Sequence, residues 1–206
     1  MPRSATLLDE PTVMYIFESS AFVNKFTTGT IDQRANFHTD GQSLEITDVG
    51  NFTHGYGVKK FKNVDVNGNQ GSDAGGDFVD TDFPMFRLAD AYLMYAECAL
   101  RGAGDMGQAL NYVNLVRTRA FGGSTSGNVT SIDLQFILDE RARELHWEGH
   151  RRTDLVRFGK FTGGSYVWPF KGNTPNGSPT PSFRNIFPIP ANALSANPTL
   201  TQNPGY

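Results

Sequence analysis

The sequence is poor in cysteine: Cys98 is the single thiol among 206 residues. One thiol cannot form an internal disulfide, and it excludes metal sites that need two cysteine ligands. Cys98 lies in the apolar, helical-looking run YLMYAECALR. Free cysteines of this kind behave as small apolar residues, so we expect Cys98 to be buried on a helix face.

Positive charge is also lacking. The chain has 18 Lys and Arg residues against 21 Asp and Glu, which gives a net charge of −3 at pH 7. Binding to nucleic acid or to an anionic membrane surface needs a concentrated basic surface. The composition therefore argues against nucleic acid as a partner and against a polybasic membrane patch.

Long apolar runs are missing as well. No run approaches the ~18 apolar residues that a membrane-spanning helix requires. The opening residues, MPRSATLLDEPTV, have no hydrophobic core of the kind that signal peptides carry. They resemble the middle of a domain more than its beginning, so we expect a chain with no membrane span and no targeting segment of its own.

Glycine, proline and aromatic residues are plentiful. The chain contains 22 Gly, 11 Pro and 16 Phe, and aromatic residues make up 12% of it. Glycine and proline in such numbers indicate many loops around a compact framework. Some of the rings are expected at the surface, where they can stack on flat ligands.

The pattern divides the chain into three zones. Residues 1–84 are polar and mixed, with short β-like runs such as TVMYIFES and YGVKKFKNV between turns. Residues 85–160 carry helical periodicity. Residues 161–206 are rich in loops, and their prolines exclude a long helix or a central strand, so we expect this tail to wrap the helical body. The predicted fold class is mainly α, with loop-rich and short-strand segments.

Two consecutive helices are expected in the helical zone, joined by the short turn GAGD. Apolar residues recur every three or four positions in each, which predicts an α-α hairpin of tetratricopeptide type. The positions expected to face inward are Leu88, Tyr92, Tyr95, Ala96 and Ala99 in the first helix and Met106, Ala109, Leu110, Val113 and Val116 in the second. A third helix is expected from a cap at Ser131 to Gly149, with a shorter one ending at Phe158.

The stretch DERARELHWEGHRRTDLVRF, residues 139–158, places Glu140, Glu144 and Glu148 on one helix face. An acid/base centre would need carboxylates whose pKa values are pushed apart in a cleft. The many arginines argue against that, because helical spacing pairs the acids with bases and keeps the carboxyl pKa values low. The expected pairs are Glu140–Arg143, Arg141–Glu144, Glu148–Arg151, Glu148–Arg152 and Asp154–Arg157. We interpret the stretch as a structural clasp between a helix and a neighbouring loop.

The same stretch holds a weak candidate for a zinc site, since His146 and His150 are four residues apart. The zincin pattern needs Glu directly after the first His, and here Gly149 is expected to end the helix between the two. The chain also shows no Ser/His/Asp order, GxSxG, P-loop or GxGxxG pattern. Neither a zinc enzyme nor one of these catalytic classes is therefore favoured.

A calcium site is the interpretation to weigh for the Gly/Asn/Asp-rich loop at 63–82. Asp65, Asn67 and Asn69 alternate as the ligands of calcium loops do. Gln70 then replaces the sharp-turn glycine, and Gly76 stands where a bidentate Glu belongs. A solvated loop is favoured, and calcium binding is left open.

Tyr56, Tyr166 and Trp168 are the candidate ligand-binding residues, because all three lie in Gly-flanked loops. Loop aromatics next to Asn and Arg suit sugar rings, whose C–H faces stack while their hydroxyls bond to amides. The alternative is that these rings pin the loops onto the core. Trp147 lies within the clasp helix and is expected to be core.

Three segments resemble the C-terminal region of the SusD/RagB family. ERARELHWEGHRRTDLVR, from Glu140 to Arg157, matches the family signature E-x-x-x-E-L-x-x-E-G-x-R-x-x-D-L-x-R at every fixed position. FPIP followed by NPTLTQNPGY is similar to the family's ending, and FRLADAYLMYAE to the first helix of its last tetratricopeptide-like unit. Ala193 departs from the pattern, since many members carry Glu there. The resemblance runs from about residue 30 to the end of the chain.

The resemblance implies a SusD-like hairpin plus an irregular lobe. Family members are surface-exposed, outer-membrane glycan-binding lipoproteins of Bacteroidetes that work with a SusC-like TonB-dependent transporter. We therefore expect a non-enzymatic protein, without cofactor or metal, that binds glycan and delivers it to such a transporter. The resemblance makes Glu140, Glu144, Glu148, Arg151, Asp154 and Arg157 a structural signature.

Family members are more than twice this length and attach to the membrane through a lipidated cysteine. Cys98 lies in mid-helix and cannot be that anchor. We therefore expect a truncated copy of the fold, either a fragment or a gene model started at an internal Met. Two other functions stay open: a glycoside hydrolase, which would need two unpaired carboxylates in a cleft, and a structural partner of the transporter without a ligand of its own.

Overall fold

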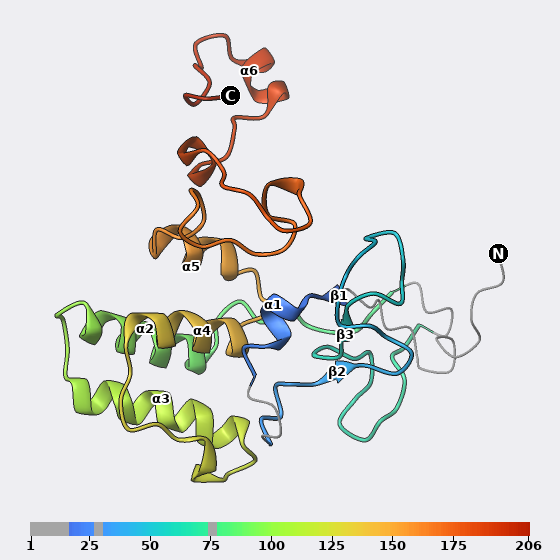
Figure 1. Ribbon diagram of the computed structural model, residues 1–206, viewed down its shortest axis with the longest axis vertical. Helices are drawn as coiled ribbons and strands as arrows, with labels where there is room; N and C mark the ends of the chain where they lie inside the picture. Colours follow the sequence, from blue (N-terminus) through green and yellow to red (C-terminus); the bar gives the residue numbers. More distant parts are fainter. Residues whose placement is uncertain (1–16, 27–30, 74–77) are drawn as a thin grey trace. The chain divides into compact units, whose positions relative to one another are not determined.

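The computed structural model describes residues 17–26, 31–73 and 78–206 (Figure 1). The chain divides into two compact units, residues 1–149 and residues 150–206, and each is described by itself. The division into three zones that the sequence suggests stays a prediction beside these two units. Among the described residues, no helix has the length and apolar character needed to cross a membrane.

A helical hairpin is the main element of the first unit. It consists of α2 (Leu88–Leu100) and α3 (Met106–Ala120), and α4 (Leu134–Glu144) packs against α2 (Figure 1). The side chain of Asp105 caps α3 by accepting a hydrogen bond from the backbone N–H of Gln108 at 2.6 Å. Small buried residues such as Ala96 and Ala109 let the helices approach closely. The predicted α-α hairpin is confirmed.

Three details of the predicted hairpin are wrong. Leu88 and Met106 are 65% and 44% exposed, because each is the first residue of its helix. Leu93, which was not expected to face inward, is fully buried. Cys98 is exposed rather than buried, since two residues past the buried Ala96 it lies about 200° further round the helix.

The clasp helix differs from its prediction at both ends. Asp133, not Ser131, caps α4, and its carboxylate accepts from the backbone N–H of Phe136 at 2.6 Å. The helix ends at Glu144 instead of Gly149. The reason is local backbone conformation: Trp147 has a left-handed φ of 64°, which an α-helix cannot contain.

A small sheet completes the described part of the first unit. Its strands are β1 (Phe17–Glu18), β2 (Phe37–His38) and β3 (Tyr56–Val58), in the antiparallel order β1-β3-β2. The short α1 (Ser20–Val23) follows β1. Residues 12–16 of the expected strand TVMYIFES lie outside the described residues.

The second unit is built mostly from loops. Its α-helices are α5 (Arg151–Arg157) and α6 (Ala191–Ala196), with short 3-10 turns at Lys171–Asn173 and Ser182–Asn185. Side chains tie the tail together: Gln202 bonds to both the N–H and the C=O of Ile189, and the Tyr206 hydroxyl donates to the carbonyl of Ile186 at 2.7 Å. Within the described residues this part holds neither a long helix nor a central strand, as its prolines predict.

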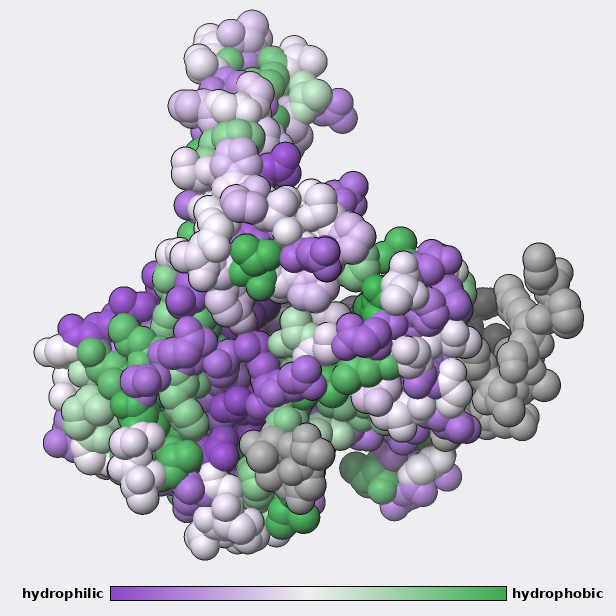
Figure 2. Space-filling model, viewed as in Figure 1, coloured by the Kyte–Doolittle hydropathy of each residue, from purple (hydrophilic) through white to green (hydrophobic). Residues whose placement is uncertain are grey.

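The surface of the hairpin is partly apolar. Figure 2 shows hydrophobic residues over α2 and α3, where Leu88, Met94, Met106 and Leu115 are among the exposed apolar side chains.

Candidate functional site

Glu140 is the most deeply buried carboxylate of the clasp. Its side chain is fully inaccessible to solvent, and it accepts hydrogen bonds from three arginines. The Nη1 atoms of Arg34 and Arg117 both lie 2.7 Å from it, and Arg143 adds bonds of 3.0 Å and 2.6 Å from Nε and Nη2. These arginines come from the chain before β2, from α3 and from α4 itself, so the carboxylate joins three segments.

Glu144, one turn later, also gathers three arginines. Arg119 donates to both of its oxygens through Nη2, at 2.6 Å and 2.5 Å. Arg87, next to α2, lies 2.9 Å from Oε1, and Arg34 lies 3.3 Å from Oε2. Only 1% of the Glu144 side chain is exposed.

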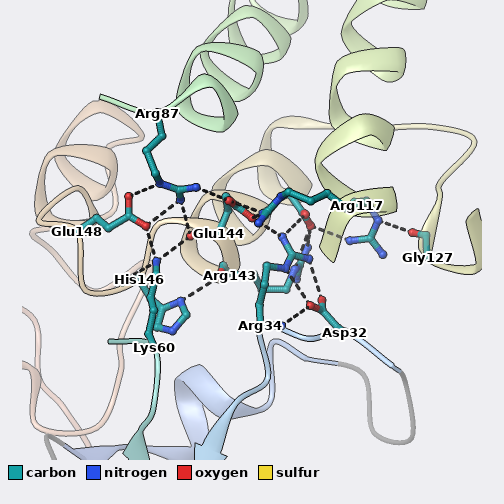
Figure 3. Close-up of polar contacts among 12 residues, drawn as sticks. Asp32, Arg34, Lys60, Arg87, Arg117, Gly127, Arg143, Glu144, His146 and Glu148 are labelled. Carbon is teal, nitrogen blue, oxygen red and sulfur yellow. Dashed lines mark hydrogen bonds and ion pairs between the residues drawn. The ribbon is translucent and has the colours of Figure 1, made fainter. Parts of the chain in front are cut away.

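Glu148 closes the row in the turn after α4 (Figure 3). Arg87 binds it through Nε at 2.7 Å and Nη2 at 2.8 Å. The Lys60 ammonium also bonds to Glu148, and it donates to the carbonyl oxygens of Glu144 at 3.0 Å and His146 at 2.8 Å. Lys60 and Arg87, which are far from this segment in sequence, thus both bind to residues 144–148.

The electrostatics of the row keep Glu140 and Glu148 ionised. Burial alone would raise the pKa of Glu140, but the guanidiniums of Arg34, Arg143 and Arg117 outweigh it and lower that pKa to about 2. Burial likewise opposes ionisation of Glu148, while its hydrogen bonds to Arg87 and Lys60 lower its pKa. A general acid needs a raised pKa, so this arrangement suits a structural clasp and not proton transfer.

The partners of the clasp differ in part from those that helical spacing predicts. The ion pairs Glu140–Arg143 and Asp154–Arg157 form as helical spacing predicts, at 2.6 Å and 2.9 Å. Arg141, however, binds Asp90 of α2 at 2.7 Å.

The predicted pairs of Glu148 with Arg151 and Arg152 applied helical spacing across the expected helix end at Gly149. In the structure α4 ends at Glu144 and α5 begins at Arg151, so that spacing does not apply between them. Arg151 lies in the second unit and donates to the Tyr166 hydroxyl at 3.0 Å. Arg152 donates there to the carbonyls of Arg184 and Asn185.

His146 and Asp65, two of the residues weighed as metal ligands, have other contacts. The Nδ1 of His146 lies 2.9 Å from the carbonyl of Arg143, and burial, aided by the charge of Lys60, lowers the His146 pKa to about 4. Asp65 accepts from the backbone N–H groups of Asn67 and Asn69 and from the Asn69 amide. Residues 74–77, Gly76 included, lie outside the described part of that loop, and the described residues hold no group of three or more His, Cys, Asp or Glu arranged for a metal ion.

Two of the three candidate aromatics lie together in the second unit. The rings of Tyr166 and Trp168 are 6.0 Å apart between centroids, at 52°, and Phe161 lies 6.4 Å from Trp168. Both candidate rings are half-buried. Lys171, only 3% exposed, places its ammonium 4.6 Å from the centroid of the Trp168 ring and donates to the carbonyls of Gly163 and Tyr166 at 2.9 Å and 2.6 Å.

Trp168 and Phe161 border a pocket of about 460 Å³. Its walls include Phe161, Trp168, Lys171, Asn173, Ser178 and Thr180. A cavity of that volume, with an aromatic wall and a few polar side chains, suits a small organic ligand such as a sugar ring. Phe170 and Asn173, also in its walls, have left-handed φ angles of 66° and 63°, a strained conformation that is common at binding sites.

The other sequence-predicted aromatics are placed differently. Tyr56 is half-buried in β3 of the first unit. Trp147 is not core as predicted: it is 37% exposed and donates its indole N–H to Glu18 at 2.9 Å. Sequence reasoning missed Phe161, Lys171 and Asn173, because no spacing distinguishes them from other loop residues.

Comparison with known proteins matches the chain to one family. The model of the SusD family covers residues 12–206. The chain is 39% identical over 165 residues to the "Starch-binding protein SusD" of Bacteroides thetaiotaomicron, which is 80% of this chain and 28% of that protein. It is also 39% identical over 132 residues to the "SusD-like protein P25" of Formosa agariphila, covering 59% of this chain and 24% of that protein.

Solved structures show the same fold. A SusD superfamily protein from Bacteroides vulgatus aligns with 92% of this chain and 39% of its own, at a TM-score of 0.61 and 24% identity. "Surface glycan-binding protein A" from Bacteroides uniformis aligns with 89% of this chain and 40% of its own, at a TM-score of 0.62 and 23% identity. This chain thus spans about a quarter to two fifths of the length of these relatives, and it belongs to the SusD family.

Proposed function

We propose that the second unit of this chain binds glycan through the pocket beside Trp168. The observation that carries the proposal is the pocket of about 460 Å³ that joins an aromatic wall to amide and hydroxyl side chains. The 39% identity to a starch-binding protein supports it.

The pocket's chemistry fits a sugar ring. A pyranose offers a C–H face, which stacks on an indole, and hydroxyls, which exchange hydrogen bonds with Asn173, Ser178 and Thr180. Lys171 holds the ammonium against the Trp168 ring and fixes the loop carbonyls on either side, so the wall is preorganised. Tyr166 is a second stacking candidate beside Trp168, and Tyr56 stays a candidate in the first unit.

We also propose that the protein is not an enzyme. A glycoside hydrolase needs a carboxylic acid with a raised pKa and a second carboxylate across a cleft. Glu140, Glu144 and Glu148 instead bind arginine or lysine and are almost fully buried. The pKa values of Glu140 and Glu148 are lowered, and burial denies all three carboxylates the access that hydrolysis requires.

The whole protein, in this proposal, captures glycan at the outer-membrane surface and passes it to a SusC-like TonB-dependent transporter. Membrane attachment would come from a lipid anchor outside this sequence. Co-purification with a transporter of that class from membrane extract tests the partnership. The alternative is a transporter partner without its own ligand, which the half-buried Trp168 in the wall of the 460 Å³ pocket disfavours.

The experiment is affinity electrophoresis of the 206-residue chain through gels that contain neutral or acidic polysaccharides. Retardation by at least one glycan is expected. In Trp168→Ala the affinity should fall about tenfold, because the stacking contact, worth about 0.5–1.5 kcal/mol, and the apolar area it buries are lost together. Trp147→Ala is the matched control, since Trp147 is a partly exposed tryptophan outside the pocket walls. Equal retardation of wild type and Trp168→Ala would overturn the site.

A further inference from the structure

A second pocket, in the first unit, lies against the clasp. Its volume is about 200 Å³, and its walls include Gln33, Arg34, Lys60, Arg87, Arg119 and Glu144. Figure 3 shows Arg34, Lys60 and Arg87 converging around Glu144. Nothing in the glycan proposal uses this pocket.

The walls of the pocket carry more positive than negative charge. They include four cations, Arg34, Lys60, Arg87 and Arg119, and one carboxylate, Glu144. His146 also lines the pocket, and its pKa of about 4 leaves it neutral at pH 7. Three of the cations share the single carboxylate of Glu144 through ion pairs of 2.5 to 3.3 Å.

The surplus persists when the whole ion-pair network is counted. Within the described residues, ion pairs join six cations to four carboxylates: Arg34, Lys60, Arg87, Arg117, Arg119 and Arg143 with Asp32, Glu140, Glu144 and Glu148. Two positive charges are therefore not balanced by the network. Most of these side chains are shielded from water, and uncompensated charge in such a place is costly unless an anion balances it.

Arg119 has hydrogen-bond donors that its ion pair with Glu144 does not use. Its Nη2 makes both bonds to Glu144, while within the described residues its Nε and Nη1 have no hydrogen-bond partner. The Arg119 side chain is 58% exposed, so the fork opens to solvent at the pocket. The Gln33 amide, another donor group, lines the same walls.

We propose that this pocket binds a small oxyanion, namely a carboxylate, sulfate or phosphate group. A guanidinium fork and an amide match the paired oxygens of such a group, and a volume of about 200 Å³ accommodates it. A metal cation is excluded by the same surplus of positive charge. The oxyanion is either a free ion or the acidic substituent of a sugar, and the site is independent of the Trp168 pocket.

The test is isothermal titration of the 206-residue chain with sodium sulfate, sodium phosphate and methyl glucuronide, with neutral methyl glucoside as the blank. Saturable binding of at least one anion is expected, weakened about tenfold or more in Arg119→Gln, because one charge-assisted hydrogen bond is lost. Arg119→Lys, which keeps the charge without the fork, should fall between. Arg101→Gln is the matched control, since Arg101 is a half-exposed arginine outside the pocket walls that pairs with Glu97.

The outcomes separate the two sources. Binding of glucuronide, together with Arg119-dependent retardation by acidic polysaccharide, identifies an acidic sugar unit; binding of sulfate or phosphate alone identifies a free ion. No saturable anion binding, or equal binding by Arg119→Gln and wild type, would overturn the site. Loss of retardation by a neutral glycan in Trp168→Ala tests the other pocket. Either proposal can therefore be overturned while the other stands.

Discussion

Arg87 grips Glu148 with two parallel hydrogen bonds, from Nε at 2.7 Å and from Nη2 at 2.8 Å. The two residues are 61 positions apart, and the fork ties the start of α2 to the turn after α4. A third nitrogen of the same guanidinium reaches Glu144 at 2.9 Å. One arginine thus fixes the angle between two helices, because its planar donors match both carboxylates at once.

Replacing Arg87 with Lys should therefore destabilise the chain although the charge is kept. An ammonium cannot make the fork to Glu148 and also reach Glu144, so we expect a loss of about 2 kcal/mol in the free energy of unfolding. Urea unfolding followed by far-UV circular dichroism measures it. Arg101→Lys, which alters the pair between Glu97 and the half-exposed Arg101 at the end of α2, should cost under about 0.5 kcal/mol. Equal costs for the two changes would show that the fork geometry contributes nothing.

Glu140→Gln should be more damaging still. The amide is nearly the same shape, but it leaves Arg34, Arg117 and Arg143 around a neutral group in a fully buried place. Removing one member of a buried ion network costs about 3–5 kcal/mol. The same urea midpoint should fall well below that of Asp139→Asn, whose carboxylate is partly exposed and binds Lys25. A midpoint for Glu140→Gln within error of the wild type would contradict the clasp.

The contrast between Glu140 and Cys98 shows how far sequence reasoning reaches. The fold class, the hairpin and the ionised state expected for the glutamates follow from periodicity and from the density of arginines around them. The exposure of Cys98 could not be obtained in the same way, since a position two residues after the buried Ala96 lies on the solvent side of the helix. An apolar neighbourhood in sequence is not an apolar face in space.

The long-range ion-pair partners of the clasp glutamates could not be predicted from the sequence, for a second reason. Helical spacing finds only pairs within one helix, whereas Arg34, Lys60 and Arg87 reach the glutamates from 57 or more residues away. The break at Trp147 was equally hidden, because a left-handed tryptophan is imposed by tertiary contacts and has no local signal. The Trp168 pocket likewise depends on Lys171, which no motif singles out.

Acid should weaken the chain through Glu140. Its pKa is lowered from an ordinary 4.5 to about 2 in the folded protein, so the unfolded chain binds a proton first as the pH falls. The contribution is fully present above pH 4.5 and is lost as the pH falls through about 2, an effect of roughly 3 kcal/mol. Urea midpoints measured from pH 6 to pH 2 should fall over that window. Glu140→Gln should show a shallower fall, and parallel curves would contradict the assignment.

His146 should make stability depend on pH over a second, higher pH range. Burial and Lys60 lower its pKa from 6.5 to about 4, so its neutral ring stabilises the fold above pH 6.5 and that contribution is lost as the pH falls to about 4. The Cε1 proton resonance of His146 should therefore stay at its neutral position through pH 5. A His146 midpoint near 6.5 would show that the ring is solvated.

Lys171→Met should loosen the pocket wall that contains Trp168. The substitution keeps an unbranched side chain but removes two hydrogen bonds, to the carbonyls of Gly163 and Tyr166, and the cation above the indole. We expect a shifted tryptophan emission spectrum and at least about tenfold weaker retention by the bound glycan, because the wall is no longer held in place. Lys160→Met is the matched control, since that ammonium lies 5.7 Å from the Tyr166 ring centroid and is outside the pocket walls. If Lys171→Met binds glycan as the wild type does, Lys171 does not preorganise the wall. The neighbouring rings of Phe161 and Tyr166 would then be what positions Trp168.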